Sequence, residues 1–313
     1  MKTVEITYRY GAQYAAAPRP LDSNAAHARL NDGNQVFAAL LEGMADDNSR
    51  VQKIIYVDPR DLGLLAGDPA LPKQRPFAAI LGCSDARVPV ELIFNEGPND
   101  LFVIRVAGNS LGTEVLGSLK YAVEHLSGSL KLIVVLGHSG CGAVTAAVDV
   151  FLNPTDYLSL TTKHSLRSIL DGLLVVVQAS AKKIQEAFGP DVSHHPGYRQ
   201  ALIEASIVTN SALAAYSLQQ EFGASDPAGL QVAYGVYLLE TRQVWAPHVS
   251  KAKGIGLAAA PRDQAGFIEL GNAILQSDRI ASLIRTKMPS PLGHATLDAI
   301  DGRIAAEQAK RAA

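Results

Sequence analysis

The stretch KLIVVLGHSGCGAV, residues 131–144, joins an unbroken apolar run to a glycine-rich turn that carries a histidine and a cysteine. A short continuous apolar run of this kind predicts a strand buried on both faces. His138 and Cys141 have two residues between them directly after the run, so the turn can direct one imidazole and one thiolate at the same cation. This stretch therefore predicts both a buried strand and two ligands of a metal site.

Two similar runs precede it, PFAAIL at residues 76–81 and LFVIRVAG at residues 101–108. Residues 111–126 lie between the second and third runs and have apolar positions at helical spacing. Strand, helix and strand at this length predict parallel pairing through a right-handed crossover. A further strand is predicted at residues 230–240, and the TRQVWAP that follows it favours an antiparallel edge hairpin.

Residues 21–44 place their apolar side chains on one helical face, which predicts an N-terminal helical arm. Ser23 or Asn24 can cap the first of two short helices, and Gly33 is expected to mark a break between them. Residues 1–21 show no clear period and are predicted to be irregular.

The remaining helical periods lie in residues 151–222 and in the tail. Together the patterns predict an α/β fold: a mainly parallel central sheet with flanking helices, an antiparallel edge strand and an N-terminal helical arm. We expect a main domain at 22–250 and a C-terminal extension at 251–313, which is predicted to be helical and has no assigned chemistry.

The composition excludes several classes of partner. The chain of 313 residues has a formal net charge of -2, and its basic residues are scattered, so it lacks the electrostatic footprint of a nucleic-acid or anionic-membrane binder. The N-terminus lacks the apolar region of a signal peptide, which favours a cytoplasmic location. The longest apolar stretch, residues 169–179, is interrupted by Asp171 and predicts a buried helix rather than a membrane span.

Cys83 and Cys141 are the 2 cysteines of the chain, and both follow predicted buried strands. Groups at the carboxyl ends of neighbouring parallel strands converge on one crevice. Two thiolates and the imidazole of His138 would suit zinc and leave its fourth position free, which is the composition of a catalytic site. The alternatives are ordinary buried thiols or a single disulfide, which the reducing compartment expected here disfavours.

The residues after the first cysteine, in CSDARVP, add a carboxylate and a guanidinium. Asp85 can reach the fourth position of the cation, either by accepting a hydrogen bond from a bound water or by coordinating the ion itself. Arg87 can pair with that carboxylate through two hydrogen bonds and keep it ionised. The alternative is an ordinary ion pair in a surface turn.

These motifs closely resemble those of the β-class carbonic anhydrases. The family pattern is C-S-D-[SA]-R followed by H-x-x-C, and here the interval from Cys83 to His138 is 55 residues. The segment ELIFNEGPNDLFVIRVAGN at 91–109 and the L-x-x-G-N-x-x-F pattern at 30–37 extend the similarity, which covers most of the chain up to about Val249 and leaves out residues 1–20 and 250–313.

The resemblance implies a zinc enzyme, a carbonate dehydratase that hydrates carbon dioxide reversibly to bicarbonate and a proton through a zinc-bound hydroxide. Cys83, His138 and Cys141 match the zinc ligands of the family, and Asp85 with Arg87 matches its catalytic pair. The resemblance also implies a homodimer or a higher homo-oligomer.

Three further positions match residues of the family that face the substrate. Gln74 matches a glutamine that donates a hydrogen bond to bound substrate, and Phe102 and Tyr121 match aromatic residues on the apolar side of the site near the dimer interface. For each of them, ordinary packing is the alternative.

Some choices stay open at this point. Ile80 stands where family members regulated by bicarbonate carry a tryptophan, which favours a bound water over Asp85 as the fourth ligand. Relatives with a similar site hydrolyse carbonyl sulfide or carbon disulfide, and a non-catalytic scaffold stabilised by zinc is a third reading.

Overall fold

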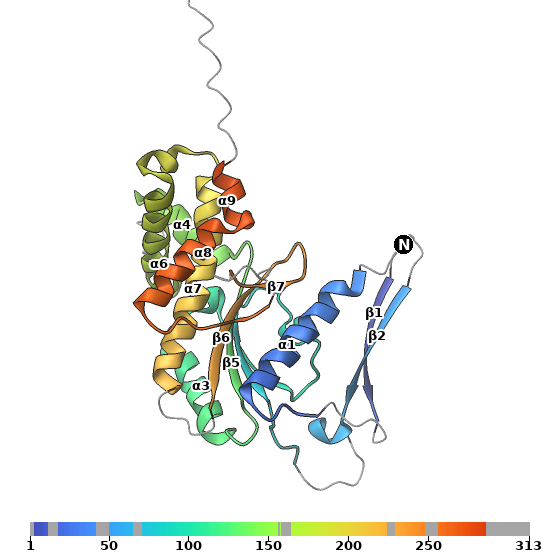
Figure 1. Cartoon of the computed structure of the whole chain (residues 1–313). Helices are drawn as coiled ribbons and strands as arrows, with labels where there is room; N and C mark the ends of the chain where they lie inside the picture. The colour runs from blue at the N-terminus through green and yellow to red at the C-terminus, as the bar shows by residue number, and fades with distance from the viewer. Residues whose placement is uncertain are drawn as a thin grey trace, which may run out of the picture.

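The computed structural model describes residues 3–11, 18–41, 50–64, 71–155, 157, 164–223, 229–247 and 256–285. Its centre is a six-stranded sheet in the order β4-β3-β5-β6-β7, with β8 also paired to β6 (Figure 1). The strands are β3 (Ala78–Gly82), β4 (Leu101–Arg105), β5 (Leu132–His138), β6 (Gln231–Tyr237), β7 (Val244–Trp245) and β8 (Ala258–Ala259). β4, β3, β5 and β6 are parallel, and β7 and β8 run antiparallel to β6, which confirms the predicted fold class.

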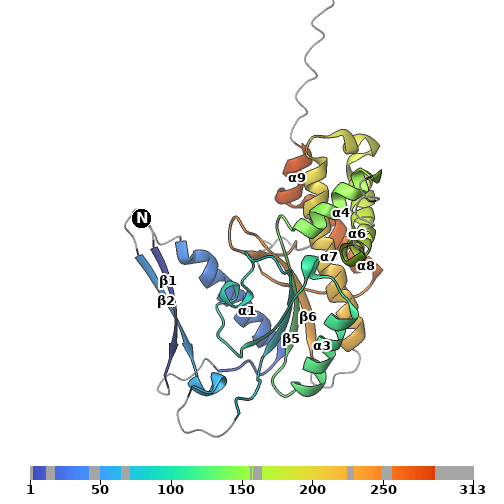
Figure 2. The same cartoon turned by 180° about the vertical axis from the view of Figure 1, so that it is seen from behind.

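Helices cover both faces of this sheet (Figures 1 and 2). One face carries α1 (Ser23–Ala38) and the short α2 (Val90–Ile93). The other carries α3 (Thr113–His125), α4 (Gly142–Leu152), α6 (His164–Phe188), α7 (Tyr198–Phe222), α8 (Gln264–Gln276) and α9 (Asp278–Arg285). The connections include the 3₁₀ turns η1 (Ala39–Leu41), η2 (Pro59–Leu62), η3 (Ala107–Asn109) and η4 (Pro190–His194).

The apolar runs are continuous because each strand is buried on both faces. Along β5, Ile133 and Val135 face the core under α3, α4, α6 and α7, whereas Leu132 and Val134 face the core under α1. All of these side chains are fully buried. Alternate side chains of one strand therefore stabilise two separate apolar layers.

α7 is long and apolar enough to cross a membrane by length and composition, but 78% of its apolar window is buried inside the protein. It packs against β5, β6 and α6, so its apolar side chains form part of the hydrophobic core. The predicted helices of the C-terminal extension are present as α8 and α9, and residues 286–313 of that extension lie outside the described residues.

The predicted break at Gly33 is wrong, because α1 is continuous from Ser23 to Ala38. Asp22 caps this helix, since its carboxylate accepts a hydrogen bond from the backbone N–H of Ala25 at 2.8 Å. Gly33 serves close packing instead: a Cβ there would lie 1.9 Å from the carbonyl oxygen of Phe94. The glycine lets the helix approach the backbone after α2.

The N-terminal segment also differs from its prediction as irregular. β1 (Thr3–Tyr10) pairs in parallel with β2 (Arg50–Val57), and this two-stranded sheet lies beside α1, apart from the central sheet (Figure 1). β2 was not predicted. The pairing joins segments on either side of α1, but the alternation of Val4, Ile6, Tyr8 and Tyr10 with polar residues is itself a local strand signal.

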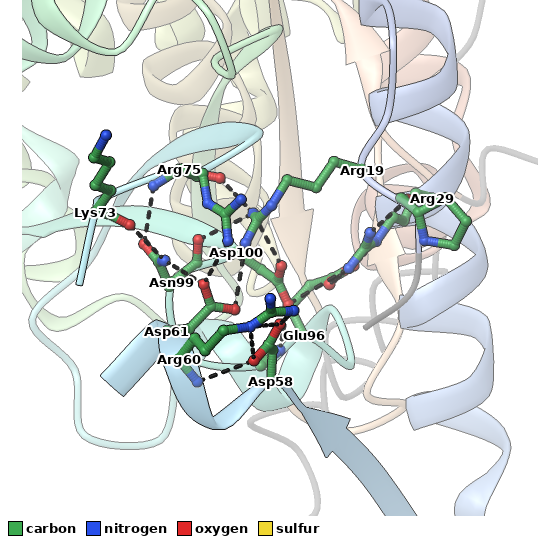
Figure 3. Close-up of polar contacts among 12 residues, drawn as sticks. Arg19, Arg29, Asp58, Arg60, Asp61, Lys73, Arg75, Glu96, Asn99 and Asp100 are labelled. Carbon is green, nitrogen blue, oxygen red and sulfur yellow. Dashed lines mark hydrogen bonds and ion pairs between the residues drawn. The ribbon is translucent and has the colours of Figure 1, made fainter. Parts of the chain in front are cut away.

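A cluster of charged side chains ties the N-terminal part of the chain to the loop after α2 (Figure 3). Arg29 of α1 pairs with Glu96 and lies 3.5 Å from Asp100. Arg19 lies 3.3 Å from Asp100 and 3.5 Å from Asp61 of η2. Burial raises the pKa of Glu96 to about 7, although the Arg29 guanidinium opposes this shift.

The Gly33→Ala substitution should lower the free energy of unfolding by about 1–3 kcal/mol, because the new methyl group must displace α1 from the loop after α2. Gly172 of α6 is the matched control: a Cβ there meets nothing within 4 Å, so Gly172→Ala should stabilise the protein by about 0.5–1 kcal/mol. Urea denaturation measures both. Equal effects of the two substitutions would rule out the close approach at Gly33.

Glu96 predicts a pH dependence of stability. Its pKa is higher in the folded chain than the 4.5 of an unperturbed glutamate, so the folded state binds the extra proton between pH 4.5 and about 7. The contribution of Glu96 to the free energy of unfolding therefore falls as the pH rises through this window, by up to about 1.4 kcal/mol per pH unit. Urea denaturation at pH 5 and pH 8 should show a smaller loss of stability for Glu96→Gln than for the wild type. Parallel curves for the two proteins would contradict the assignment.

Candidate metal centre

Three ligand atoms meet at the carboxyl ends of the neighbouring strands β3 and β5. Cys83 directly follows β3, His138 is the last residue of β5, and Cys141 directly precedes α4 at its N-cap position. All three side chains are buried, and their ligand atoms lie within 4.8 Å of one another. The two Sγ atoms are 4.0 Å apart and the thiols are free, so this geometry holds no disulfide.

The imidazole of His138 is oriented toward the thiols by its backbone partner. Nδ1 lies 3.0 Å from the carbonyl oxygen of Ser139, and a carbonyl can only accept, so Nδ1 carries the proton. Nε2 then presents a lone pair. This atom is fully buried and has no hydrogen-bond partner among the described residues. A buried acceptor without a partner beside two thiols fits a cation as its missing partner.

The charges of the two thiols lead to the same conclusion. The pKa of the Cys83 thiol is lowered, chiefly because it accepts a hydrogen bond from the Cys141 thiol. The pKa of Cys141 is raised, because its proton is held by Cys83 and because a second buried thiolate would face the first. A divalent cation would supply the positive charge that allows both to be thiolates.

The turn between the two ligands on β5 and α4 depends on Gly140. Its φ of +64° lies in the left-handed region, which L side chains rarely adopt. Ser139, the other residue of the turn, is buried, and its backbone N–H donates to the carbonyl of Tyr237 in β6 at 2.9 Å. The turn is therefore fixed from the neighbouring strand as well as by its own backbone.

Asp85 and Arg87 form the predicted pair. The Arg87 guanidinium donates to both carboxylate oxygens of Asp85, at 3.0 Å from Nε and 2.7 Å from Nη2, and the Arg87 backbone N–H donates to Oδ1 at 2.9 Å. These contacts hold the pKa of Asp85 well below its usual range. Oδ2 of Asp85 lies 3.8 Å from Nε2 of His138, so an ionised carboxylate lies next to the ligand cluster.

Arg105, at the end of β4, was not predicted to contribute. Its Nε donates to the carbonyl oxygen of Cys83 at 2.9 Å, and its Nη2 donates to that of Asp85. The guanidinium thus fixes the backbone of the turn that carries both side chains. The signal available in the sequence was one basic residue that interrupts an otherwise apolar strand.

The three residues predicted to face the substrate lie outside the ligand cluster. Gln74 is exposed in the segment before β3, Phe102 is half-buried on β4, and Tyr121 of α3 is 48% exposed and stacks on His125. Asn99 fixes the backbone on either side of Gln74: it donates to the carbonyl of Lys73 at 3.0 Å and accepts from the N–H of Arg75 at 3.0 Å (Figure 3). Their roles toward substrate stay predictions.

The sequence profile described as carbonic anhydrase matches residues 78–242, which is more than half of the chain and contains the whole ligand cluster. The chain belongs to the β-class carbonic anhydrase family. This membership confirms the predicted family and the predicted enzyme class, carbonate dehydratase.

The comparisons also found individual proteins to which this chain is similar. Carbonic anhydrase 2 of Mycobacterium tuberculosis is 38% identical over 169 residues, which cover 52% of this chain and 73% of the relative. The carbonic anhydrase of Mycolicibacterium smegmatis is 38% identical over 113 residues, or 36% of this chain and 53% of the relative. Among solved structures, a Coccomyxa β-carbonic anhydrase in complex with acetazolamide matches with a TM-score of 0.44 and 22% identity, covering 64% of this chain and 79% of that one.

The ligand cluster predicts a metal-dependent gain in stability. Zn²⁺ added to metal-free protein should raise the melting temperature, because ligand at 1,000 times its Kd stabilises the folded state by about 4 kcal/mol. Zn²⁺ should also protect both thiols from iodoacetamide. Cys83→Ser should lose the temperature shift, whereas His125→Ala, which changes an exposed histidine outside the cluster, should keep it. An equal shift in Cys83→Ser would exclude this cluster as the binding site.

Proposed function

We propose that this carbonic anhydrase catalyses the reversible hydration of carbon dioxide to bicarbonate and a proton, with zinc held by Cys83, His138 and Cys141. The observation that carries the proposal is the unpartnered Nε2 of His138, buried beside two thiols and within 3.8 Å of an ionised carboxylate. Two sulfur ligands and one nitrogen ligand suit zinc and leave a coordination position for catalysis. When bound, zinc supplies a Lewis acid that makes water a nucleophile near neutral pH.

Asp85 is proposed to orient the reacting water. Because Arg87 holds its pKa low, Asp85 is ionised at neutral pH and can only accept hydrogen bonds. An acceptor at Oδ2 fixes which hydrogen of the water points away from carbon dioxide and leaves a lone pair directed at the carbon. The Asp85–Arg87 pairing also supports the form in which Asp85 stays on Arg87 rather than on the cation, as Ile80 suggests.

Gln74, Phe102 and Tyr121 are proposed to form the substrate side of the site. Asn99 fixes the backbone of both neighbours of Gln74. The exposed side-chain amide of Gln74 is therefore presented from an ordered backbone and can donate a hydrogen bond to a developing bicarbonate oxygen. Phe102 and Tyr121 belong to β4 and α3, which contact each other at the edge of the sheet. Aromatic rings there would provide an apolar wall for carbon dioxide.

A second copy of the chain is proposed to cover this edge. β4 ends the sheet on one side, and its apolar residues Leu101, Phe102, Val103 and Ile104 are only partly buried. An unpaired apolar edge strand favours association with another chain. A homodimer formed at β4 would bury these residues and bring Tyr121 into an enclosed environment.

The Asp85→Asn variant should keep its zinc and lose about 100-fold in kcat/KM for carbon dioxide hydration, because an amide cannot replace an ionised acceptor. Stopped-flow pH-indicator assays and zinc analysis measure the two properties. The matched control is Asp149→Asn, which removes a similar carboxylate from its pair with Arg199 on the surface, at 2.7 Å and 2.9 Å, and should leave the rate unchanged.

Two outcomes would overturn the proposal. One is a zinc-loaded wild type without hydration activity, and the other is full activity in Asp85→Asn. A wild type that releases sulfide from carbonyl sulfide or carbon disulfide but does not hydrate carbon dioxide would assign the site to that hydrolysis instead.

A further inference from the structure

A chain of polar contacts leads from the metal-ligand turn to the C-terminal extension. Ser139, between the two ligands of the turn, donates from Oγ to Oε2 of Glu240 at 2.9 Å and accepts from the backbone N–H of Leu239 at 3.0 Å. Oε1 of Glu240 pairs with Arg279 at the start of α9. The side chain of Glu240 thus links Arg279 of the extension to Ser139, whose carbonyl oxygen accepts the Nδ1 proton of His138.

Arg279 is itself fixed by a buried carboxylate. Its Nε donates to Oε2 of Glu204 at 2.9 Å, and Glu204, on α7, is buried and also accepts from Gln200 at 3.0 Å. α9 is anchored by the burial of Ile280 and Ile284 in the main core. A guanidinium held on one side by a buried carboxylate can hold the second carboxylate, Glu240, in a single place.

The position of Arg279 in the chain makes this contact unexpected. Residues 78–242 match the family, so Ser139, Glu204 and Glu240 lie within the matched region, and Arg279 lies beyond it. The extension therefore adds a charge to a turn that the family domain already contains. No sequence motif indicated this connection.

We infer that Arg279 is a positioning residue for the metal centre: through Glu240 and Ser139, α9 fixes the turn that carries His138 and Cys141. The Ser139 carbonyl accepts the Nδ1 proton of His138, so the orientation of Ser139 determines where Nε2 points. Glu240 and Leu239 hold the Ser139 hydroxyl from the other side. The inference rests on the proposed function for the identity of the zinc ligands. The hydrogen bonds that connect Arg279 with Ser139 involve protein atoms and need no bound metal.

The experiment compares Arg279→Ala with wild type by three measurements. In the metal-free protein, hydrogen exchange of the amides of residues 138–142 should be about tenfold faster in Arg279→Ala. In the loaded protein, chelator competition should show Zn²⁺ affinity about tenfold weaker, as for other residues that support metal ligands indirectly. The Co²⁺-substituted variant should show a shifted visible absorption band, which a change in global stability alone would not produce.

Three further variants make the test specific. Arg199→Ala removes an arginine from its surface pair with Asp149 and should change none of the three measurements. Arg279→Lys keeps a cation and should restore part of the affinity. In a Ser139→Ala background, Arg279→Ala should cost no further affinity, because the connection is already broken.

The inference and the proposed function can fail separately. Wild-type exchange, affinity and Co²⁺ spectrum in Arg279→Ala would overturn the inference and leave carbon dioxide hydration untouched. Additive effects of the Ser139 and Arg279 substitutions would also overturn it. If the wild type lacks hydration activity but Arg279→Ala speeds exchange at residues 138–142 of the metal-free protein, the proposed function fails and the connection stands.

Discussion

The parallel pairing of β3 with β5 is the constraint on which the site depends. Their register places Gly82 opposite Leu136, so Cys83 and His138 follow at adjacent ends of neighbouring strands. The pairing is held by apolar side chains on two faces at once, and a slip of one residue would exchange every side chain between the two cores. The position of the ligands is therefore set by the burial of Ile80, Leu81, Val134 and Val135 rather than by the ligands themselves.

The polar groups around the cluster complete what this pairing begins. Arg105 fixes the carbonyls of Cys83 and Asp85 from β4, and Tyr237 fixes the N–H of Ser139 from β6. Each strand next to the two ligand-bearing strands thus contributes one residue that contacts the turn beside it. Desolvated ligands held at fixed positions need little rearrangement to accept a cation, which reduces the conformational entropy lost on binding.

The sequence predicted what depends on local pattern. The three apolar runs indicated the parallel strands, and Cys83, Asp85, His138 and Cys141 could be selected because they directly follow such runs. Patterns that depend on distant partners were not predictable. The reason for Gly33 is the backbone of Phe94, which no local pattern shows. The strand β1 is a different case, because the alternation of residues 4–10 is a local strand signal that the prediction of an irregular segment overlooks. Arg105 and Arg279 act through carbonyls and carboxylates that sequence spacing does not reveal.

Two carboxyl groups of the molecule have pKa values that are shifted in opposite directions by their surroundings. Around Glu96, burial dominates and raises the pKa of a carboxyl that packs the N-terminal arm against the domain. At Asp85, a bidentate arginine dominates and keeps the carboxyl ionised beside the thiols. Asp85 is partly exposed and Glu96 is buried. The carboxyl of Asp85 is therefore a permanent hydrogen-bond acceptor, whereas that of Glu96 is a titrating group. The acidity of each carboxyl is thus set by its burial and by the guanidinium it faces, and only the acceptor lies at the metal centre.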